Sequence, residues 1–250
     1  MKQAIMIFAG LLLSLPVSVN AKTVKPESLP QDSVLLLGET AFANSDFRKA
    51  ISFLNYYVLN NPTSPDVQKA QFHLAESYYN LKKYDEASVE YEFLYKQYPG
   101  SQYSEQAQIK AATSKFETSE PYYKEQITTL DVQKMATEFL RKYPNSIYAP
   151  DARKLLARID EKLARKELEA AKLYFKFKEY NAAVMSLEYI LGEYPLAKET
   201  NFETSYYLGL CKMKLGELEE AQALMEELSG NQKWQKKAQK VLAKIAKELE

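Results

Sequence analysis

Few side chains in this sequence have the types and spacing that catalysis or metal binding requires. The single histidine, His73, lies in a segment of helical pattern, and no second histidine or cysteine cluster accompanies it to complete a zinc site. Glycine-rich phosphate loops, a Gly-x-Ser-x-Gly elbow and a His-Glu-x-x-His helix are absent. Acidic pairs such as Glu219 and Glu220 are better explained by a solvated helix face than by acid–base chemistry. We therefore expect no enzyme activity and no cofactor or metal.

Cysteine content and net charge exclude two further classes of protein. The single cysteine, Cys211, stands near Leu210 and Met213 in a predicted helix, where a packed free thiol is expected, and it allows no disulfide within the chain. Charge is balanced, with 33 basic and 33 acidic residues, and no stripe of Lys and Arg is interleaved with aromatic residues. We therefore do not expect nucleic acid to be a partner.

The strongest pattern in the sequence is a repeat. The small residues Gly38, Ala75 and Ala112 are each 37 positions apart. Two sets of mainly apolar residues keep the same interval: Leu35, Phe72 and Ile109, and Phe42, Tyr79 and Phe116. An interval held by three residue classes indicates one supersecondary unit copied along the chain, which predicts a repeat array that binds other proteins.

Most predicted units end at a proline, which cannot continue a helix because it has no N–H and clashes with the preceding turn. These prolines are Pro62, Pro99, Pro144 and Pro195. Before them recur an aromatic or apolar residue and an alanine: Phe47 and Ala50, Tyr84 and Ala87, Tyr180 and Ala183, and Leu218 and Ala221 in the last unit. The pattern resembles the tetratricopeptide repeat (TPR), in which two helices approach closely at small residues and large residues fill the space between hairpins.

The repeats predict an all-α TPR solenoid of about five helix pairs. Pairs are expected over residues 33–60, 66–98, 104–143, 150–194 and 202–228, and an amphipathic helix over 234–249 is expected to cap the last pair. Two units are longer than a standard repeat. Ser119 and Pro121 indicate a loop between the helices of the third unit, and the run from Pro150 to Phe177 predicts one long helix.

The beginning of the sequence has the pattern of a secretory signal peptide over residues 1–21. Lys2 precedes an apolar run, and Val19-Asn20-Ala21 offers small residues for cleavage. We expect the mature chain to begin near Lys22 and residues 22–31, which contain two prolines, to form a flexible tether. No second apolar run is long enough to cross a bilayer. These features predict a periplasmic protein with no transmembrane segment in the mature chain.

A stretch of the later units resembles one family in particular. The residues that carry the resemblance are Tyr143-Pro144-Asn145-Ser146-Ile147-Tyr148, Asp151-Ala152, Leu163-Ala164, Glu167, Tyr174, Tyr180, Ala182-Ala183-Val184, Glu188 and Tyr194-Pro195. They resemble the BamD family, also called ComL or YfiO, of periplasmic TPR subunits of the outer-membrane β-barrel assembly machine. The resemblance implies a scaffold that recognises unfolded outer-membrane proteins through its N-terminal repeats and docks through its C-terminal repeats on periplasmic domains of the β-barrel insertase.

Two surfaces are predicted on this basis. Units over residues 32–147 are expected to form a client groove on the first helix of each pair, lined by Glu39, Phe42, Phe72, Glu76, Tyr79, Asn80, Ile109 and Phe116. Residues 148–250 are expected to dock on the insertase, with Arg153, Arg158 and Arg165 as candidate contacts for carboxylates. The aromatic residues also have the spacing of core residues, and the arginines that of a solvated face, so packing and solvation are the alternatives.

One departure from the family and two other functions remain open. Family members are typically lipoproteins, but Ala21-Lys22 stands where the acylated cysteine would follow the signal, so we expect peripheral association without a lipid anchor. A coordinator of envelope or cell-wall processes, as in the Tol-Pal system, is the main alternative, although such proteins usually carry an N-terminal coiled coil. Glu76-Ser77 is similar to the Glu-Ser of lytic transglycosylases, but the Gly-Leu-Met-Gln of that family does not follow it.

Overall fold

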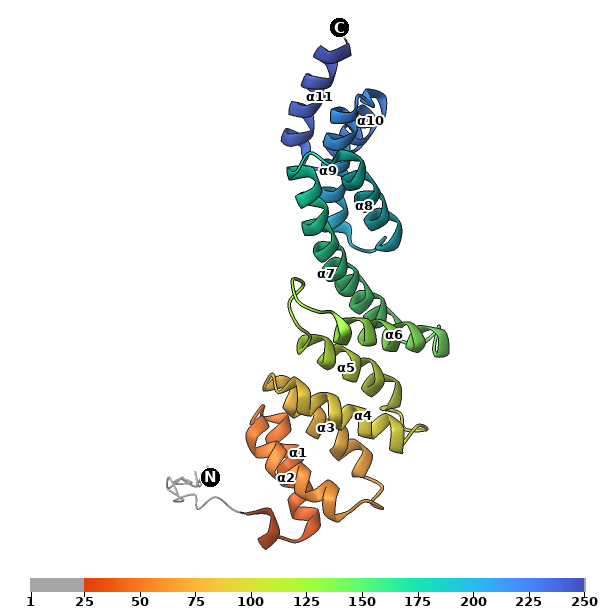
Figure 1. Cartoon of the computed structure of the whole chain (residues 1–250). Helices are drawn as coiled ribbons and strands as arrows, with labels where there is room; N and C mark the ends of the chain where they lie inside the picture. Colours follow the sequence, from red (N-terminus) through yellow and green to blue (C-terminus); the bar gives the residue numbers. More distant parts are fainter. Residues whose placement is uncertain (1–24, 250) are drawn as a thin grey trace, which may run out of the picture.

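The computed structural model describes residues 25–249, which form an elongated stack of helices (Figure 1). The described elements are the 3₁₀ helix η1 (Pro26–Ser28) and the α-helices α1 (Gln31–Ala43), α2 (Phe47–Asn60), α3 (Val67–Asn80), α4 (Tyr84–Gln97), α5 (Ser104–Glu117), α6 (Ile127–Lys142), α7 (Ala149–Lys176), α8 (Tyr180–Glu193), α9 (Lys198–Leu215), α10 (Leu218–Ser229) and α11 (Gln235–Leu249). The predicted signal peptide and the first residues of the predicted tether lie outside the described residues.

The helices pair as the repeat predicts. Five antiparallel hairpins, α1/α2, α3/α4, α5/α6, α7/α8 and α9/α10, follow one another, and the second helix of each pair packs on the first helix of the next. Helix α11 packs on α10 and closes the C-terminal end (Figure 1). The predicted TPR solenoid with a capping helix is therefore confirmed.

Small residues set the distance between the two helices of a hairpin. Ala75 and Ala87 are fully buried where α3 meets α4. At Gly38 a Cβ atom would lie 2.8 Å from Cδ2 of Leu54, so glycine there lets α1 approach α2 more closely than alanine could. The 37-residue interval thus marks the points at which backbones come closest.

Four of the five hairpin turns share one backbone conformation. A residue with left-handed φ ends the first helix of four units: Ser45 (φ 60°), Lys82 (58°), Lys178 (66°) and Gly216 (82°). A left-handed residue at this place stops the helix and lets the chain reverse within a few residues. In the third unit the predicted longer loop, between α5 and α6, replaces this tight turn.

Helix α7 is the long helix that the sequence predicts, and it belongs to two cores. Its first half contributes Leu155 and Ile159 to the core shared with α5 and α6. Its second half contributes Leu168 and Ala171 to the core shared with α8 and α9. With 28 residues it extends about 42 Å at 1.5 Å per residue, and it joins the lower and upper groups of helices in Figure 1.

The start of the described chain is packed against the first unit. Pro26, within the predicted tether, is buried in η1, and Leu29 packs on the core formed by α1, α2 and α3. This part of the tether is therefore held against the array. Among residues 25–249, no helix is both long enough and apolar enough to span a membrane.

The burial of Phe72 generates a test of the core. Phe72→Ala should lower the free energy of unfolding by about 3 kcal/mol, because it empties a buried aromatic site. Leu36→Ala is the matched control, since Leu36 is 66% exposed and should change stability little. Chemical denaturation followed by circular dichroism measures both. An equal and small effect of the two variants would contradict the burial of Phe72 in the core.

Candidate peptide-binding groove

The residues predicted to line the groove differ widely in exposure. Phe72 and Ile109 are only 7% and 3% exposed, and Phe116 is also buried. Phe72 was expected in the groove, but Tyr103, which precedes α5, stacks on its ring with centroids 4.9 Å apart. These three residues belong to the cores between units, and of the predicted aromatic residues only Phe42 and Tyr79 remain half-buried.

A recurring contact, which we call the clasp, joins the first helices of neighbouring units. In a clasp, a cationic or imidazole side chain of one unit contacts both an acidic group and an aromatic ring of its neighbour. Between α1 and α3, both carboxylate oxygens of Glu39 lie 2.9 Å from Nδ1 of His73, and the imidazole stacks on Phe42 at 4.2 Å. Because a carboxylate only accepts, the proton of this hydrogen bond is on His73.

The clasp between α3 and α5 uses the residues one repeat further on. Nζ of Lys110 lies 3.0 Å from Glu76 and 4.6 Å from the ring centroid of Tyr79. The hydroxyl of Tyr91, on α4, also donates to Glu76. Burial and the neighbouring Glu76 carboxylate raise the pKa of Tyr91, so it stays a neutral donor. Glu76 therefore accepts from two directions, and the exposed Asn80 bonds to the backbone oxygen of Glu76.

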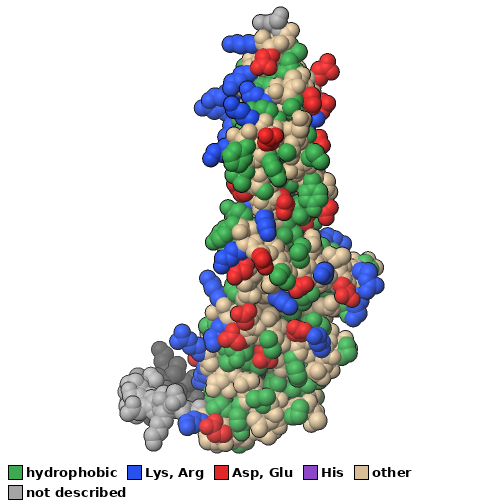
Figure 2. Space-filling view, viewed as in Figure 1, with side chains coloured by type: hydrophobic (Ala, Val, Ile, Leu, Met, Phe, Trp, Pro, Cys, Tyr) green, Lys and Arg blue, Asp and Glu red, His purple; other side chains and the backbone are tan. Residues whose placement is uncertain are grey.

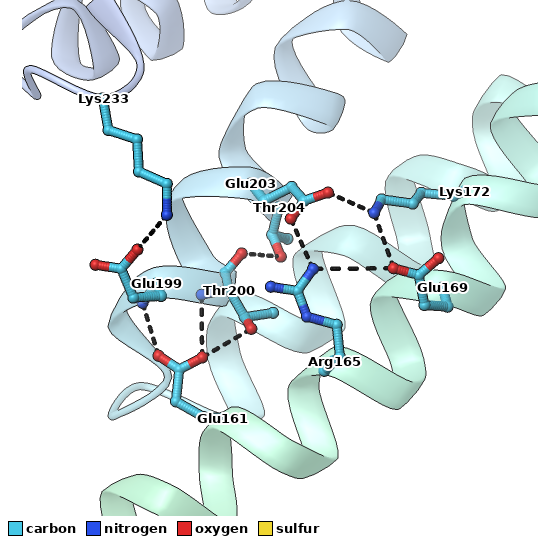
Figure 3. A network of polar contacts seen from close by, with 9 residues as sticks. All are labelled: Glu161, Arg165, Glu169, Lys172, Glu199, Thr200, Glu203, Thr204 and Lys233. Atoms are coloured by element: carbon cyan, nitrogen blue, oxygen red, sulfur yellow. Dashed lines mark hydrogen bonds and ion pairs between the residues drawn. The ribbon is translucent and has the colours of Figure 1, made fainter. Parts of the chain in front are cut away.

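The third and fourth clasps involve the predicted docking arginines. Arg158, on α7, lies 2.8 Å from Glu117 and 4.7 Å from the ring of Phe116. Between α7 and α9 the direction reverses, because the acid, Glu203, is on the later helix. Arg165 donates to Glu203 at 2.6 Å, and Lys172 pairs with the same carboxylate (Figure 3). Nζ of Lys172 also lies 5.3 Å from the ring centroid of Tyr207 on α9.

The clasp between α7 and α9 extends into a polar network at the start of α9. Backbone N–H groups of Glu199 and Thr200 donate to Glu161 of α7, at 2.6 and 3.2 Å (Figure 3). An acidic side chain that accepts the free N–H groups of a first helical turn stabilises that end of the helix. Glu161 thus fixes where α9 begins against α7.

Two of the clasp acids, Glu39 and Glu203, have lowered pKa values. Burial alone would raise the pKa of Glu39, but hydrogen bonds from His73 and Lys69 outweigh it and hold the pKa below its ordinary value. Burial alone would also raise the pKa of Glu203, but the hydrogen bonds from Lys172 and Arg165 outweigh it and hold this pKa below its ordinary value. Both carboxyl groups are therefore ionised near neutral pH.

Two adjoining pockets lie where units 2, 3 and 4 meet. The first, which we call the Tyr79 pocket, is a cavity of about 260 Å³ lined by α3, α5 and α7, with Tyr79, Gln106, Lys110, Lys154 and Arg158 on its walls. It brings together two predicted groove residues, Tyr79 and Ile109, and one predicted docking residue, Arg158. The client groove and the docking surface, which were predicted on different units, therefore meet at Arg158.

The second hollow, the Tyr123 pocket, has a volume of about 750 Å³ and shares Arg158 with the first. It lies between α7 and the loop that joins α5 to α6, where Tyr122 and Tyr123 are 37% and 70% exposed. Lys162 holds this loop by donating to Oγ of Ser119 at 2.7 Å. The loop is predicted from the sequence, but neither tyrosine was among the predicted site residues, although two adjacent aromatic residues in a surface loop are a usable signal.

The predicted residues therefore separate into three groups. Tyr79, Ile109 and Arg158 line the Tyr79 pocket. Phe116 and Arg165 line the Tyr123 pocket, and Arg165 also pairs with Glu203. Glu39 and Phe42 lie in the first clasp, outside both pockets. Arg153 is exposed on α7 and has no ion pair among the described residues.

Comparison with known protein families shows to which family the chain belongs. Residues 30–227 match the family YfiO, described as "Outer membrane lipoprotein". The chain belongs to the YfiO family. The match runs from the end of the predicted tether through α9 into α10, so the predicted family resemblance is confirmed, and α11 lies beyond the matched residues.

Curated relatives agree with the YfiO match. An outer membrane protein assembly factor BamD of Pasteurella multocida is 25% identical over 184 residues, which cover 70% of this chain and 71% of that protein. The BamD of Buchnera aphidicola is 30% identical over 178 residues, covering 65% and 72%. Among solved structures, a TPR protein of Thermus thermophilus aligns over 87% of this chain and 99% of its own, at 16% identity and a TM-score of 0.37.

The clasp at Glu203 predicts how stability responds to a single substitution. Glu203→Gln should lower the free energy of unfolding by about 1–3 kcal/mol, because it removes the less exposed of the two carboxylates that Arg165 and Lys172 share. Their side chains are 30% and 21% exposed, and they keep only Glu169, which is 45% exposed. Glu199→Gln is the control, since its pair with Lys233 is 63% and 69% exposed and should contribute little. Thermal denaturation of both variants measures the difference.

The same variant tests the pH dependence. An acid with a lowered folded pKa contributes stability that is present above its unfolded pKa, 4.5 for glutamate, and lost as pH falls through the folded value. The parent should therefore lose melting temperature more steeply than Glu203→Gln below about pH 4.5. Parallel slopes would contradict the role of this carboxylate.

Proposed function

We propose that this chain is a non-catalytic periplasmic assembly factor for outer-membrane proteins, which binds unfolded clients in its groove and docks on the β-barrel insertase. Membership of the YfiO family and the names of the curated relatives support the assembly role. The observation that carries the client-binding part is the pair of adjoining pockets at Arg158, where aromatic rings and cationic side chains face the same open space.

The chemistry of the two pockets suits the C-terminal segment of an unfolded outer-membrane protein. Such a segment is extended, alternates in polarity, and ends in an aromatic residue with a free carboxylate. Exposed Tyr122 and Tyr123 offer ring faces for the aromatic terminus. Lys154 and Lys162 offer cations for the carboxylate. Gln106 and Thr113 on α5 supply polar groups for the exposed backbone of the client.

The docking part of the proposal rests on the later units. Helix α7 presents a rigid face that two cores hold in place. Of the three arginines assigned to docking, Arg158 and Arg165 already pair with Glu117 and Glu203. Arg153, which has no ion pair within residues 25–249, can bind a partner carboxylate without disturbing the internal clasps. We therefore assign the docking contact to Arg153.

The client pocket is tested by peptide binding. Tyr123→Ala should weaken the binding of a labelled peptide with a C-terminal aromatic residue by about 1–3 kcal/mol, which is roughly 5-fold to 150-fold, because an exposed ring acts as an anchor. Tyr174→Ala, at an exposed tyrosine near the other end of α7, is the control. Fluorescence anisotropy gives both affinities. Amidation of the peptide terminus should weaken binding to the parent in the same direction, and unchanged affinity in Tyr123→Ala would place the client elsewhere.

The docking contact is tested by charge reversal. Arg153→Glu should reduce recovery of the insertase by roughly tenfold in a pull-down from a crosslinked envelope, because it places a repulsive charge at the contact. Arg141→Glu, at a 77% exposed arginine on α6, should leave recovery unchanged. If the parent recovers peptidoglycan-associated proteins in place of the insertase, the coordinator alternative is correct and the docking proposal is wrong.

A further inference from the structure

The outer face of α11 carries an uninterrupted stripe of lysines. Residues 233–249 contain six lysines and one glutamate, Glu248. Lys233 lies just before α11, and the other five lysines lie on it: Lys236, Lys237, Lys240, Lys244 and Lys247. At about 100° per residue these five fall within roughly one third of the helix circumference. Figure 2 shows the basic side chains gathered along one edge of the molecule, over the C-terminal end that α11 occupies in Figure 1.

The packing of α11 fixes which way this stripe points. Trp234, Ala238, Val241 and Ile245 are buried in the core that α11 shares with α9 and α10. They lie on the side of the helix opposite the lysines, so α11 cannot turn without exposing its apolar face. The lysines are all exposed. The stripe is therefore a fixed feature of the folded array.

The structure gives most of these lysines no internal role. Among the described residues, Lys233 pairs with Glu199 at 2.7 Å and Lys237 lies 4.4 Å from the Trp234 ring centroid. No ion pair within residues 25–249 involves Lys236, Lys240, Lys244 or Lys247. Lys236, Lys240 and Lys244 follow one another at four-residue spacing, where like charges destabilise a helix. These lysines repel one another and form no ion pair within the described structure. Their arrangement therefore indicates that they bind an anion outside the molecule.

The composition of the stripe favours a lipid surface over a protein. Protein interfaces are depleted in lysine and are centred on aromatic residues or arginine. The stripe contains no arginine, and the only large apolar side chain that α11 exposes among the described residues is Leu249, at its end. Clusters of four to eight basic residues on an amphipathic helix are typical of sites that bind anionic lipid headgroups. Lysine binds such a surface as a point charge and needs no shaped pocket.

We propose that the lysine face of α11 binds the surface of an anionic phospholipid bilayer. The chain as a whole has balanced charge, so attraction to such a surface orients the molecule by its C-terminal end. The face is remote along the array from α1, where the described chain begins (Figure 1). It also lies beyond residues 30–227, which match the YfiO family.

Co-sedimentation with vesicles tests the proposal. The full mature chain should bind vesicles of phosphatidylcholine and phosphatidylglycerol, bind pure phosphatidylcholine vesicles far less, and be released by salt. Replacing Lys236, Lys240, Lys244 and Lys247 together by Gln should lower the partition coefficient by about tenfold or more. The control replaces four exposed lysines on other helices, Lys49, Lys96, Lys134 and Lys176, by Gln and makes the same change in net charge.

The outcomes separate surface binding from other roles. The four-lysine α11 variant should keep or raise its melting temperature, because like-charge repulsion within the helix is relieved, while it loses vesicle binding. An equal loss of vesicle binding in the α11 and control variants would show that binding depends only on net charge, and it would overturn the proposal. Absence of binding to anionic vesicles by the parent would also overturn it, and capture of an acidic protein through the same lysines would then assign the face to that protein.

Discussion

Each first helix in this array meets the next across polar side chains, and the clasp makes that contact possible. An acid such as Glu76 is half-buried between units and would be costly without a partner. Lys110 neutralises Glu76 and also lies over the ring of Tyr79. One side chain therefore satisfies both the polar and the apolar part of the contact.

The clasps also decide what is left for a client. Glu39, Phe42 and Glu76 bind neighbouring units, and a client that competed for them would have to open the array. The groups that remain lie where the repeat is irregular, in the loop that carries Tyr122 and Tyr123 and on α7 at Lys154. The surface available for binding therefore comes from departures from the repeat, whereas the regular positions hold the array together.

The same division explains which features the sequence predicts. Helix pairs, their turns and the long α7 follow from proline, alanine and small residues that recur at a fixed interval. The burial of Phe72 does not, because the ring that covers it belongs to Tyr103, in the connection between two units. The residues of the clasps could be recognised from the sequence, because Glu39 and Glu76 are 37 positions apart, as are His73 and Lys110. Their pairing across units needs the structure, because the partners lie 34 residues apart and belong to different helices.

The angle between the two halves of the molecule depends on the middle of α7. There the connection between α8 and α9 returns to the helix: the backbone N–H of Leu196 donates to Asp160 at 3.2 Å, and Tyr194 packs against the cores on both sides. Burial raises the pKa of Asp160, and the bond from Leu196 only partly opposes this. The junction thus holds the carboxylate of Asp160, on α7 itself, in a buried site where ionisation costs free energy. Since α7 continues without a break through this point, one helix carries Lys154 and Arg158 at the pockets and also fixes the direction in which the C-terminal units extend.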